Sequence, residues 1–368
     1  MNMSIILTKS QKSALAHFTK YGYKNKKEAI NEINDILKNS NIAFSEYLKV
    51  IETIKNKARV CIHFHPDRPD PSMKTTIENL YKQGIYKSQF ETFISSGAVS
   101  PFIGGSRDKW EKKLFGGAYN TLFTKTSERP KYGSLDLMLN ADGPSPRFGS
   151  CYFVLKPEVS HRCTFTYMDS HQLPKERGTL KEFDFIISAL LRDTFHHNNT
   201  LGERDITIKE LFHHINSNLG ESIKNLTDMD PKRNLNNYIE AQIHGNISLK
   251  NDIETLVTDP SFIETDIGEK IEQTCNKYSI KLLWHMGFAM KTNDVPYDFR
   301  GNEMPKLAEF ISINKTINPF LIGFAVMDLY KNPEKWKNWG IEKEIIQKLK
   351  LLWHVLVKYG KKHKEIYM

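Results

Sequence analysis

Cysteines are few in this chain of 368 residues, and they are not arranged in pairs. The four cysteines are widely spaced and include no Cys-x-x-Cys pair; they are Cys61, Cys151, Cys163 and Cys275. This spacing argues against a zinc ribbon and against a disulfide framework. The first three lie among apolar or aromatic neighbours, so we expect buried, reduced thiols of the kind found in a cytosolic setting.

Long apolar runs are missing as well. No stretch approaches the roughly 18 residues needed to span a bilayer. The short apolar patch at residues 5–7 is not followed by the small residues of a cleavage site. We therefore expect a soluble, cytoplasmic-type protein with no secretory signal peptide and no membrane association. The string Gly-x-Gly-x-x-Gly is also absent, which argues against a Rossmann dehydrogenase.

The composition is that of a globular protein with a basic surplus. Hydrophobic residues make up 39% and charged residues 26%, so a packed core is expected and wholesale disorder is not. The length fits one large domain or two to three small ones. A net charge of +9 is compatible with nucleic acid, a membrane surface or an anionic small ligand. Because the lysines are spread along helical segments, solvated faces explain most of this charge.

Hydrophobic periodicity divides the chain into three parts and predicts an α+β fold. We expect a helical N-terminal lobe (residues 1–57), a mixed core (58–262) and a helical C-terminal region (263–368). Helices are predicted over residues 74–92, 180–197, 206–218 and 345–359. Strands are predicted over residues 59–65, 148–155, 162–167, 238–244 and 253–257, with a short polar turn joining the second to the third. Residues 97–117, rich in glycine, serine and proline, are predicted as loop.

Two histidines stand near the end of the first predicted strand. Alternation places His63 and His65 on one side of it, shortly before Asp67. Two imidazoles so placed can bind a divalent metal, donate hydrogen bonds to a ribose and an amide, or simply be structural. The string is short and common, so it does not decide among these uses by itself.

Three further side chains suit a binding site. The hydroxyl of Ser88 can orient a catalytic carboxylate, or it can cap a helix. Tyr119 follows the pair Gly116–Gly117, and Tyr132 follows a little later. A tyrosine beside glycines can stack on a flat ring that the open backbone lets approach, or it can belong to the core.

The strand at residues 238–244 has two unlike faces. Ile239, Ala241 and Ile243 form one face, which is apolar. Glu240 and Gln242 lie on the other, between a tyrosine and a histidine. A carboxylate in mid-strand has low strand propensity and therefore needs a reason. It is either a solvent-facing residue or a group that binds and polarises a sugar.

Several strings together resemble an uncharacterised bacterial family catalogued as a domain of unknown function. They are HFHPDR, SQFET, LFGGAY, RPKYG, DGPSPRFGSCY, EAQIHG, LLWHMGF and VPYDFRG, and they cover roughly residues 60–302. Some members, including effectors delivered from a bacterium into host cells, are similar to ADP-ribosyltransferases. The resemblance implies a mono-ADP-ribosyltransferase core with a split β-sheet. It also implies NAD⁺ as cosubstrate, no metal, and transfer to arginine on host glutamate dehydrogenase.

The same resemblance implies roles for individual residues. Glu240 would stabilise the charge that develops on the ribose, and Gln242 and Ser88 would hold Glu240 or the acceptor. The cosubstrate would be bound by His65, alone or together with His63, by the rings of Tyr119 and Tyr132, and by Arg68 or Arg107 at the pyrophosphate. Which first-strand residue contacts NAD⁺ stays open among His63, His65, Arg59 and Arg68. Arginine-specific relatives carry an acid or amide two residues before the catalytic glutamate, where this chain has Tyr238.

Two other functions are compatible with the sequence. A metal-dependent hydrolase would use His63, His65 and Asp67. Its site would be completed by one of His196, His197, His213, His214 or His285. A non-enzymatic basic protein binding nucleic acid or another protein is the second, although no helix-turn-helix, zinc or ribonucleoprotein string supports it.

Overall fold

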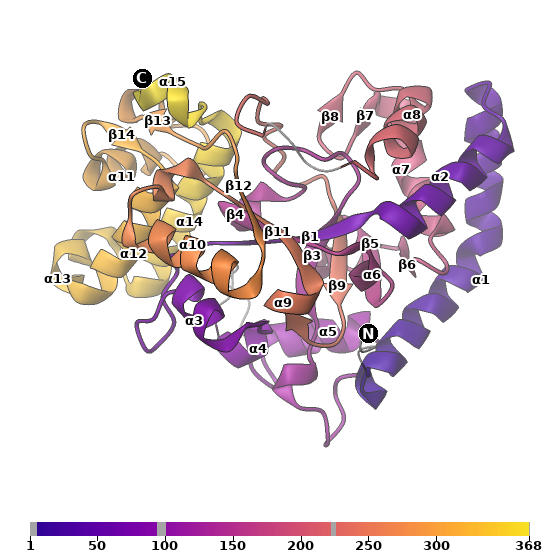
Figure 1. Ribbon diagram of the computed structural model, residues 1–368, viewed down its shortest axis with the longest axis horizontal. Helices are drawn as coiled ribbons and strands as arrows, with labels where there is room; N and C mark the ends of the chain where they lie inside the picture. The colour runs from indigo at the N-terminus through magenta and orange to yellow at the C-terminus, as the bar shows by residue number, and fades with distance from the viewer. Residues whose placement is uncertain (1–5, 94–100, 222–225, 368) are drawn as a thin grey trace.

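An eight-stranded sheet runs through the middle of the molecule (Figure 1). The computed structural model describes residues 6–93, 101–221 and 226–367. In order across the sheet, the strands are β12 (Lys281–Trp284), β11 (Ile253–Thr258), β4 (Cys151–Leu155), β1 (Arg59–Phe64), β3 (Lys131–Asp136), β9 (Ile239–Ile243), β5 (Cys163–Tyr167) and β6 (Arg177–Thr179). All neighbours are antiparallel except β11 and β12. Strands from the predicted core and from the C-terminal region therefore share one sheet.

The N-terminal helices cover one face of this sheet. They are α1 (Lys9–Asn39) and α2 (Phe44–Lys57), joined there by α7 (Asp184–His197) and α8 (Ile208–Asn218) on the right of Figure 1. Alternate residues of β1, Val60, Ile62 and Phe64, point into the core beneath them. The N-terminal helices thus pack on the sheet and contribute to its main hydrophobic core.

The C-terminal helices cover part of the opposite face. These are α11 (Met304–Ile311), α12 (Pro319–Lys331) and α14 (Glu342–Tyr359), on the left of Figure 1. Their apolar side chains pack with Cys61, Tyr152 and Val257 from the neighbouring strands β1, β4 and β11. The remainder of this face, over β3, β9 and β5, is polar. That polar half lies beside α5 (Ser106–Leu114), which packs on α1 through Trp110, among others.

Shorter elements connect these layers. They are α3 (Thr76–Gln83), β2 (Ile85–Tyr86), α4 (Gln89–Thr92), α6 (Pro157–Ser160), β7 (Asn199–Thr200), β8 (Glu203–Arg204), β10 (Ile247–Ser248), α9 (Leu249–Asp252), α10 (Asp266–Tyr278), β13 (Met290–Lys291), β14 (Thr316–Ile317), α13 (Pro333–Trp336) and α15 (His363–Tyr367). None of the helices in the described part of the chain is both long and apolar enough to cross a membrane.

Much of the predicted secondary structure is confirmed, together with the α+β class. The five predicted strands correspond to β1, β4, β5, β9 and β11, and the helices predicted over residues 180–197, 206–218 and 345–359 correspond to α7, α8 and α14. Cys61, Cys151 and Cys163 are free and buried, as expected from their apolar neighbours, and Cys275 is free and buried as well.

Several predictions are corrected by the structure. The helix predicted over residues 74–92 ends at Gly84, which has φ 67°, and β2 and α4 follow. The described part of the predicted loop at 97–117 contains α5, because Trp110 and Leu114 provide an apolar stripe. The strands β4 and β5 are not joined by a turn: α6 lies between them in the chain, and the three strands β1, β3 and β9 separate them in the sheet. The eight core strands belong to one hydrogen-bonded sheet where a split sheet was predicted.

Candidate functional site

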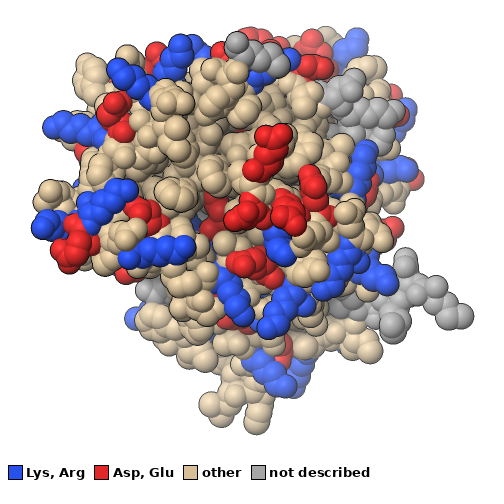
Figure 2. Space-filling view, turned by 60° about the vertical axis from the view of Figure 1, so that its left-hand side comes forward, with Lys and Arg blue, Asp and Glu red and all other residues tan. Residues whose placement is uncertain are grey.

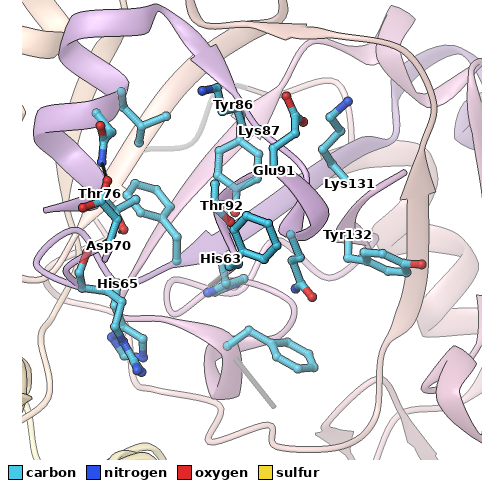
Figure 3. Close-up of a pocket in the computed structure, with 18 of the residues that line it drawn as sticks. His63, His65, Asp70, Thr76, Tyr86, Lys87, Glu91, Thr92, Lys131 and Tyr132 are labelled. Carbon is cyan, nitrogen blue, oxygen red and sulfur yellow. Dashed lines mark hydrogen bonds between the residues drawn. The ribbon is translucent and has the colours of Figure 1, made fainter. Parts of the chain in front are cut away.

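A cavity of about 570 Å³ lies against the polar half of the sheet (Figure 3). Its walls come from the end of β1 and the loop after it, from α3, β2, α4, α5 and β3, and from the segments before β4 and after β5. Glu240 from β9 and Lys350 from α14 complete the lining. In Figure 3, His65 and Tyr132 lie toward opposite sides of the cavity, with His63 between them. Most of the residues predicted from separate motifs therefore meet in one place.

Glu240 is a buried carboxylate that faces this cavity and is held in place by hydrogen bonds. Its oxygens accept hydrogen bonds from the hydroxyl and the backbone amide of Ser170, the latter at 3.3 Å, and from Nε2 of Gln242 at 3.0 Å. Only 6% of the residue is exposed. Burial, with the charge of Asp169, raises the pKa of Glu240 to about 7, although the hydrogen bonds act in the opposite direction. The carboxyl can therefore be ionised or protonated close to neutral pH.

Gln242 acts on the cavity through Glu240. It is fully buried, and its Oε1 accepts the hydroxyl of Thr164 at 2.8 Å while its Nε2 lies 3.3 Å from the hydroxyl of Thr166. Both threonines stand on the neighbouring strand β5, so cross-strand partners fix the amide. The predicted contact between Gln242 and Glu240 is present. Gln242 itself does not line the cavity.

The two predicted histidines have different environments, and His63 is tied to the backbone. Its Nδ1 lies 3.1 Å from the carbonyl oxygen of Gly149, and the amide of Ser145 donates to its Nε2 at 3.3 Å. These partners assign the neutral tautomer with the proton on Nδ1. Burial lowers the pKa of His63 to about 3. A Cβ at Gly143, where φ is +73°, would lie 2.4 Å from Nε2, so the loop closes tightly over this ring.

His65 lines the same cavity with its ring nitrogens unengaged by the described residues. The imidazole meets the ring of Trp353 edge to face, with centroids 5.3 Å apart. Burial, followed by the charge of Arg68, lowers the pKa of His65 to about 3. His65 is therefore a neutral imidazole with one donor and one acceptor available to a ligand.

Tyr132 stands at the other side of the cavity in an aromatic wall. Its ring lies 5.5 Å from that of Trp110, and its hydroxyl donates to Glu111 at 2.7 Å. The guanidinium of Arg107 lies over both rings, 4.8 Å from the centroid of Trp110 and 5.1 Å from that of Tyr132. Nε and Nη1 of Arg107 are buried and find no hydrogen-bond partner among the described residues. Such donors call for an acceptor, which a ligand could supply.

Besides Gln242, two predicted site residues lie outside the cavity lining. Tyr119 is buried with 1% exposure, and its hydroxyl is bonded to Nδ1 of His244 beneath the polar face. Ser88 is the N-cap of α4, and its hydroxyl is directed to Glu91 at 2.8 Å and to the carbonyl oxygen of Thr126 at 3.0 Å. The place that the sequence reasoning gave to Ser88, beside Glu240, is occupied by Ser170.

The residues of the alternative metal site do not converge. Asp67 lies outside the main cavity, packed against Gly323 of α12. Within the described residues, no group of three His, Cys, Asp or Glu side chains is placed to hold a metal ion. The histidine pair at 196–197 is exposed at the end of α7. The donor arrangement therefore gives no support to the metal-dependent hydrolase.

The distribution of charged side chains on the surface is relevant to the alternative of a nucleic-acid-binding protein. On the face shown in Figure 2, Lys and Arg side chains are interspersed with Asp and Glu, and acidic side chains gather near the middle of the view. Nucleic-acid-binding surfaces instead concentrate basic side chains in a patch or stripe. This face offers no such patch.

Several cavity residues were not predicted from the sequence, namely Trp110, Arg147, Asp169 and Lys350, and neither was Ser170, which holds Glu240 from outside the lining. Only one signal for them was available. The triplet Asp169–Ser170–His171 directly follows a predicted strand, and an aspartate so placed often caps a turn. In the structure Asp169 does accept the amide of His171, at 2.9 Å. Nothing in the sequence indicates that Lys350, on the last long helix, reaches a site on the sheet.

Comparison with known protein families matches residues 59–359 to one family, described as "Protein of unknown function (DUF3626)". The match begins at the first residue of β1 and ends at the last residue of α14, so the whole cavity lies inside it. A search of the curated proteins finds no significant match.

Proposed function

We propose, for a chain that belongs to the DUF3626 family of proteins of unknown function, that the cavity transfers ADP-ribose from NAD⁺ to a protein side chain. The observation that carries this proposal is the setting of Glu240. One carboxylate faces the cavity from the middle of a strand and is almost completely buried. Hydrogen bonds from Ser170 and Gln242 hold it in its orientation. This is the arrangement that stabilises a positively charged sugar. The further likeness to ADP-ribosyltransferases rests on the sequence motifs given above.

The reaction breaks the bond between the nicotinamide nitrogen and C1′ of the ribose. The bonding electron pair leaves with nicotinamide, and positive charge develops on the sugar, as in glycoside cleavage. Ionised Glu240 accepts a hydrogen bond from a ribose hydroxyl and stabilises that charge. The interaction is strong because Glu240 is almost completely shielded from water and is already oriented.

Other cavity residues fit the binding of the dinucleotide. The wall formed by Trp110 and Tyr132 offers flat apolar surface to the nicotinamide ring. Beside it, two N–H groups of Arg107 that have no partner among the described residues offer donors. His65 supplies a neutral imidazole to a ribose hydroxyl or to the nicotinamide amide. His63, whose two nitrogens are already bonded to the backbone, lines the cavity but does not bind through them.

The acceptor is proposed from the resemblance alone: an arginine of a host glutamate dehydrogenase. A guanidinium nitrogen of that arginine would form the new bond to C1′ and release a proton. Glu240 suits this second step because burial raises its pKa to about 7, so the carboxylate can take the proton near neutral pH. Nicotinamide and the modified arginine are the products.

The experiment that tests this function uses labelled NAD⁺ and a host-cell lysate. The purified protein should label a protein band, and Glu240→Gln, which keeps the shape of the side chain, should not. Mass spectrometry of the band should then find ADP-ribose on an arginine. Release of no nicotinamide and labelling of no protein, in lysates that contain glutamate dehydrogenase, would contradict the proposal.

A further inference from the structure

Positive charge is concentrated where the C-terminal helix α14 meets the cavity. Arg68 follows β1, Arg147 lies on the short turn before β4, and Lys350 lies on α14, and all three line the cavity. Arg300 adds a fourth positive charge close to them, which acts on both Lys350 and His354. Three cations from separate segments therefore line the cavity, and a fourth, outside the lining, adds to their positive potential.

These cations are poorly compensated by the protein itself. Nη1 of Arg147 donates to Asn236 at 2.8 Å, but its Nε is buried with no hydrogen-bond partner among the described residues, and the same holds for Nε of Arg300. Asp67 offsets part of the charge at Arg68, and Asp169 part of that at Lys350. Burial, followed by the charges of Arg147, Arg68 and Arg300, lowers the pKa of Lys350 to about 8. The folded protein thus holds positively charged side chains close together although they repel one another.

We propose that Arg68, Arg147 and Lys350 form a subsite for a phosphate or diphosphate group, with Arg300 reinforcing its positive potential. A multiply charged oxyanion is the ligand that relieves this repulsion, because it accepts hydrogen bonds from several cations at once. It also satisfies the buried guanidinium nitrogen of Arg147. The C-terminal region, which was predicted to lie outside the catalytic core, would then complete the binding site through Lys350.

The subsite also separates two arginines that the sequence left as alternatives. Arg68 belongs to this cationic end, whereas Arg107 lies over the rings of Trp110 and Tyr132. Anion binding at Arg68, Arg147 and Lys350 does not depend on chemistry at Glu240. The phosphate can come from the dinucleotide or from another phosphorylated ligand.

The test is calorimetric titration of the full chain with inorganic pyrophosphate at constant ionic strength. The wild type should bind it saturably, and Arg147→Gln and Lys350→Gln should each weaken binding about tenfold or more, since each removes a charge-assisted contact. Lys343→Gln is the matched control, because Lys343 is exposed on the same helix, and its affinity should change less than about twofold. Melting temperatures of Arg147→Gln and Lys350→Gln should not fall, because each removes one of several repelling cations.

Further arms identify the source of the phosphate. Displacement of pyrophosphate by NAD⁺ would assign the subsite to the dinucleotide, and NAD⁺ binding without displacement would assign it to a separate phosphorylated ligand. Glu240→Gln should bind pyrophosphate like the wild type, so a failure of the transfer reaction would leave this result unchanged. Absence of saturable pyrophosphate binding by the wild type would overturn the subsite. Unchanged binding by the Arg147 and Lys350 variants would do so as well.

Discussion

Ser170 donates its hydroxyl proton to Oε1 of Glu240 from a turn that lies 70 residues earlier in the chain. The turn is itself fixed, because Nε1 of Trp110 donates to the carbonyl oxygen of Ser170 at 2.8 Å. Strand β9 provides the carboxylate, while the segment after β5 and helix α5 decide where it points. Ser170 is therefore a positioning residue, acting through Glu240.

Replacing Ser170 by alanine should slow transfer about tenfold to a hundredfold, because Glu240 loses one charge-assisted hydrogen bond. The hydroxyl lowers the pKa of Glu240, so its removal should also move the rising limb of the pH–rate profile to higher pH. Rates measured between pH 5 and 9 provide both readouts. A slower enzyme with an unshifted profile would indicate that Ser170 has only a structural role.

The wild-type rate should depend on the ionisation of Glu240. Because burial raises its pKa to about 7, the active carboxylate is scarce at pH 5 and predominant at pH 8. The rate at saturating NAD⁺ should rise about tenfold per pH unit below 7 and level off above it. His65, with a pKa lowered to about 3, stays neutral over this range and should not contribute. A rate that falls as the pH rises from 5 to 7 would contradict the assigned role.

The same raised pKa predicts that the folded protein becomes less stable as the pH rises, whereas its rate increases. In the unfolded chain Glu240 loses its proton near pH 4.5, and in the folded protein near 7, so the unfolded state binds fewer protons between these values. Stability due to this group therefore falls as the pH rises through that window. Glu240→Gln should be more stable than the wild type at pH 8, by up to about 3 kcal/mol, and should lose this advantage at pH 4.5. Denaturant unfolding of both proteins at the two pH values is the measurement.

Replacing His65 should affect ligand binding, and replacing His63 should affect the stability of the fold. His65→Ala removes a ring that has no hydrogen-bond partner among the described residues, so NAD⁺ affinity should fall about tenfold with little change in melting temperature. His63→Ala leaves the carbonyl of Gly149 and the amide of Ser145 without their partner, and should destabilise the fold by about 2–4 kcal/mol. Calorimetric titration with NAD⁺ and thermal unfolding of both variants are the measurements. The reverse pattern would assign ligand binding to His63.

The sequence predicted those parts of the site that follow from local alternation. The two faces of β9 are confirmed: Ile239, Ala241 and Ile243 join the main core, while Glu240 reaches the cavity. Strand β3 was missed because Lys131 and Gly133 have low strand propensity. The structure shows why the glycine is there: a Cβ would lie 2.5 Å from the carbonyl oxygen of Cys61 on β1. Close approach between strands is a tertiary property that one chain segment does not reveal.

The other unpredicted site residues reach the cavity from distant parts of the chain, which local sequence patterns do not reveal. Ser88 and Ser170 both stand at the start of a short helical turn, and only the folded chain brings Ser170, not Ser88, to Glu240. Lys350 lies on an amphipathic helix whose lysines look solvent-exposed from their spacing. Its place in the cavity depends on how α14 packs over β1 and β4. The family match, which extends to residue 359, is consistent with this helix being part of the same unit.

The most direct test compares a single turnover of NAD⁺ by the wild type and by Glu240→Gln. NAD⁺ is first bound to an excess of the protein, and the release of nicotinamide is then followed over time. The two NAD⁺ affinities should lie within about threefold of each other, because the carboxylate acts on the transition state and not on the bound cosubstrate. The rate of nicotinamide release should be at least about a hundredfold lower in the variant. Similar rates for the two proteins at equal occupancy would contradict the role of Glu240, and with it the proposed transfer reaction.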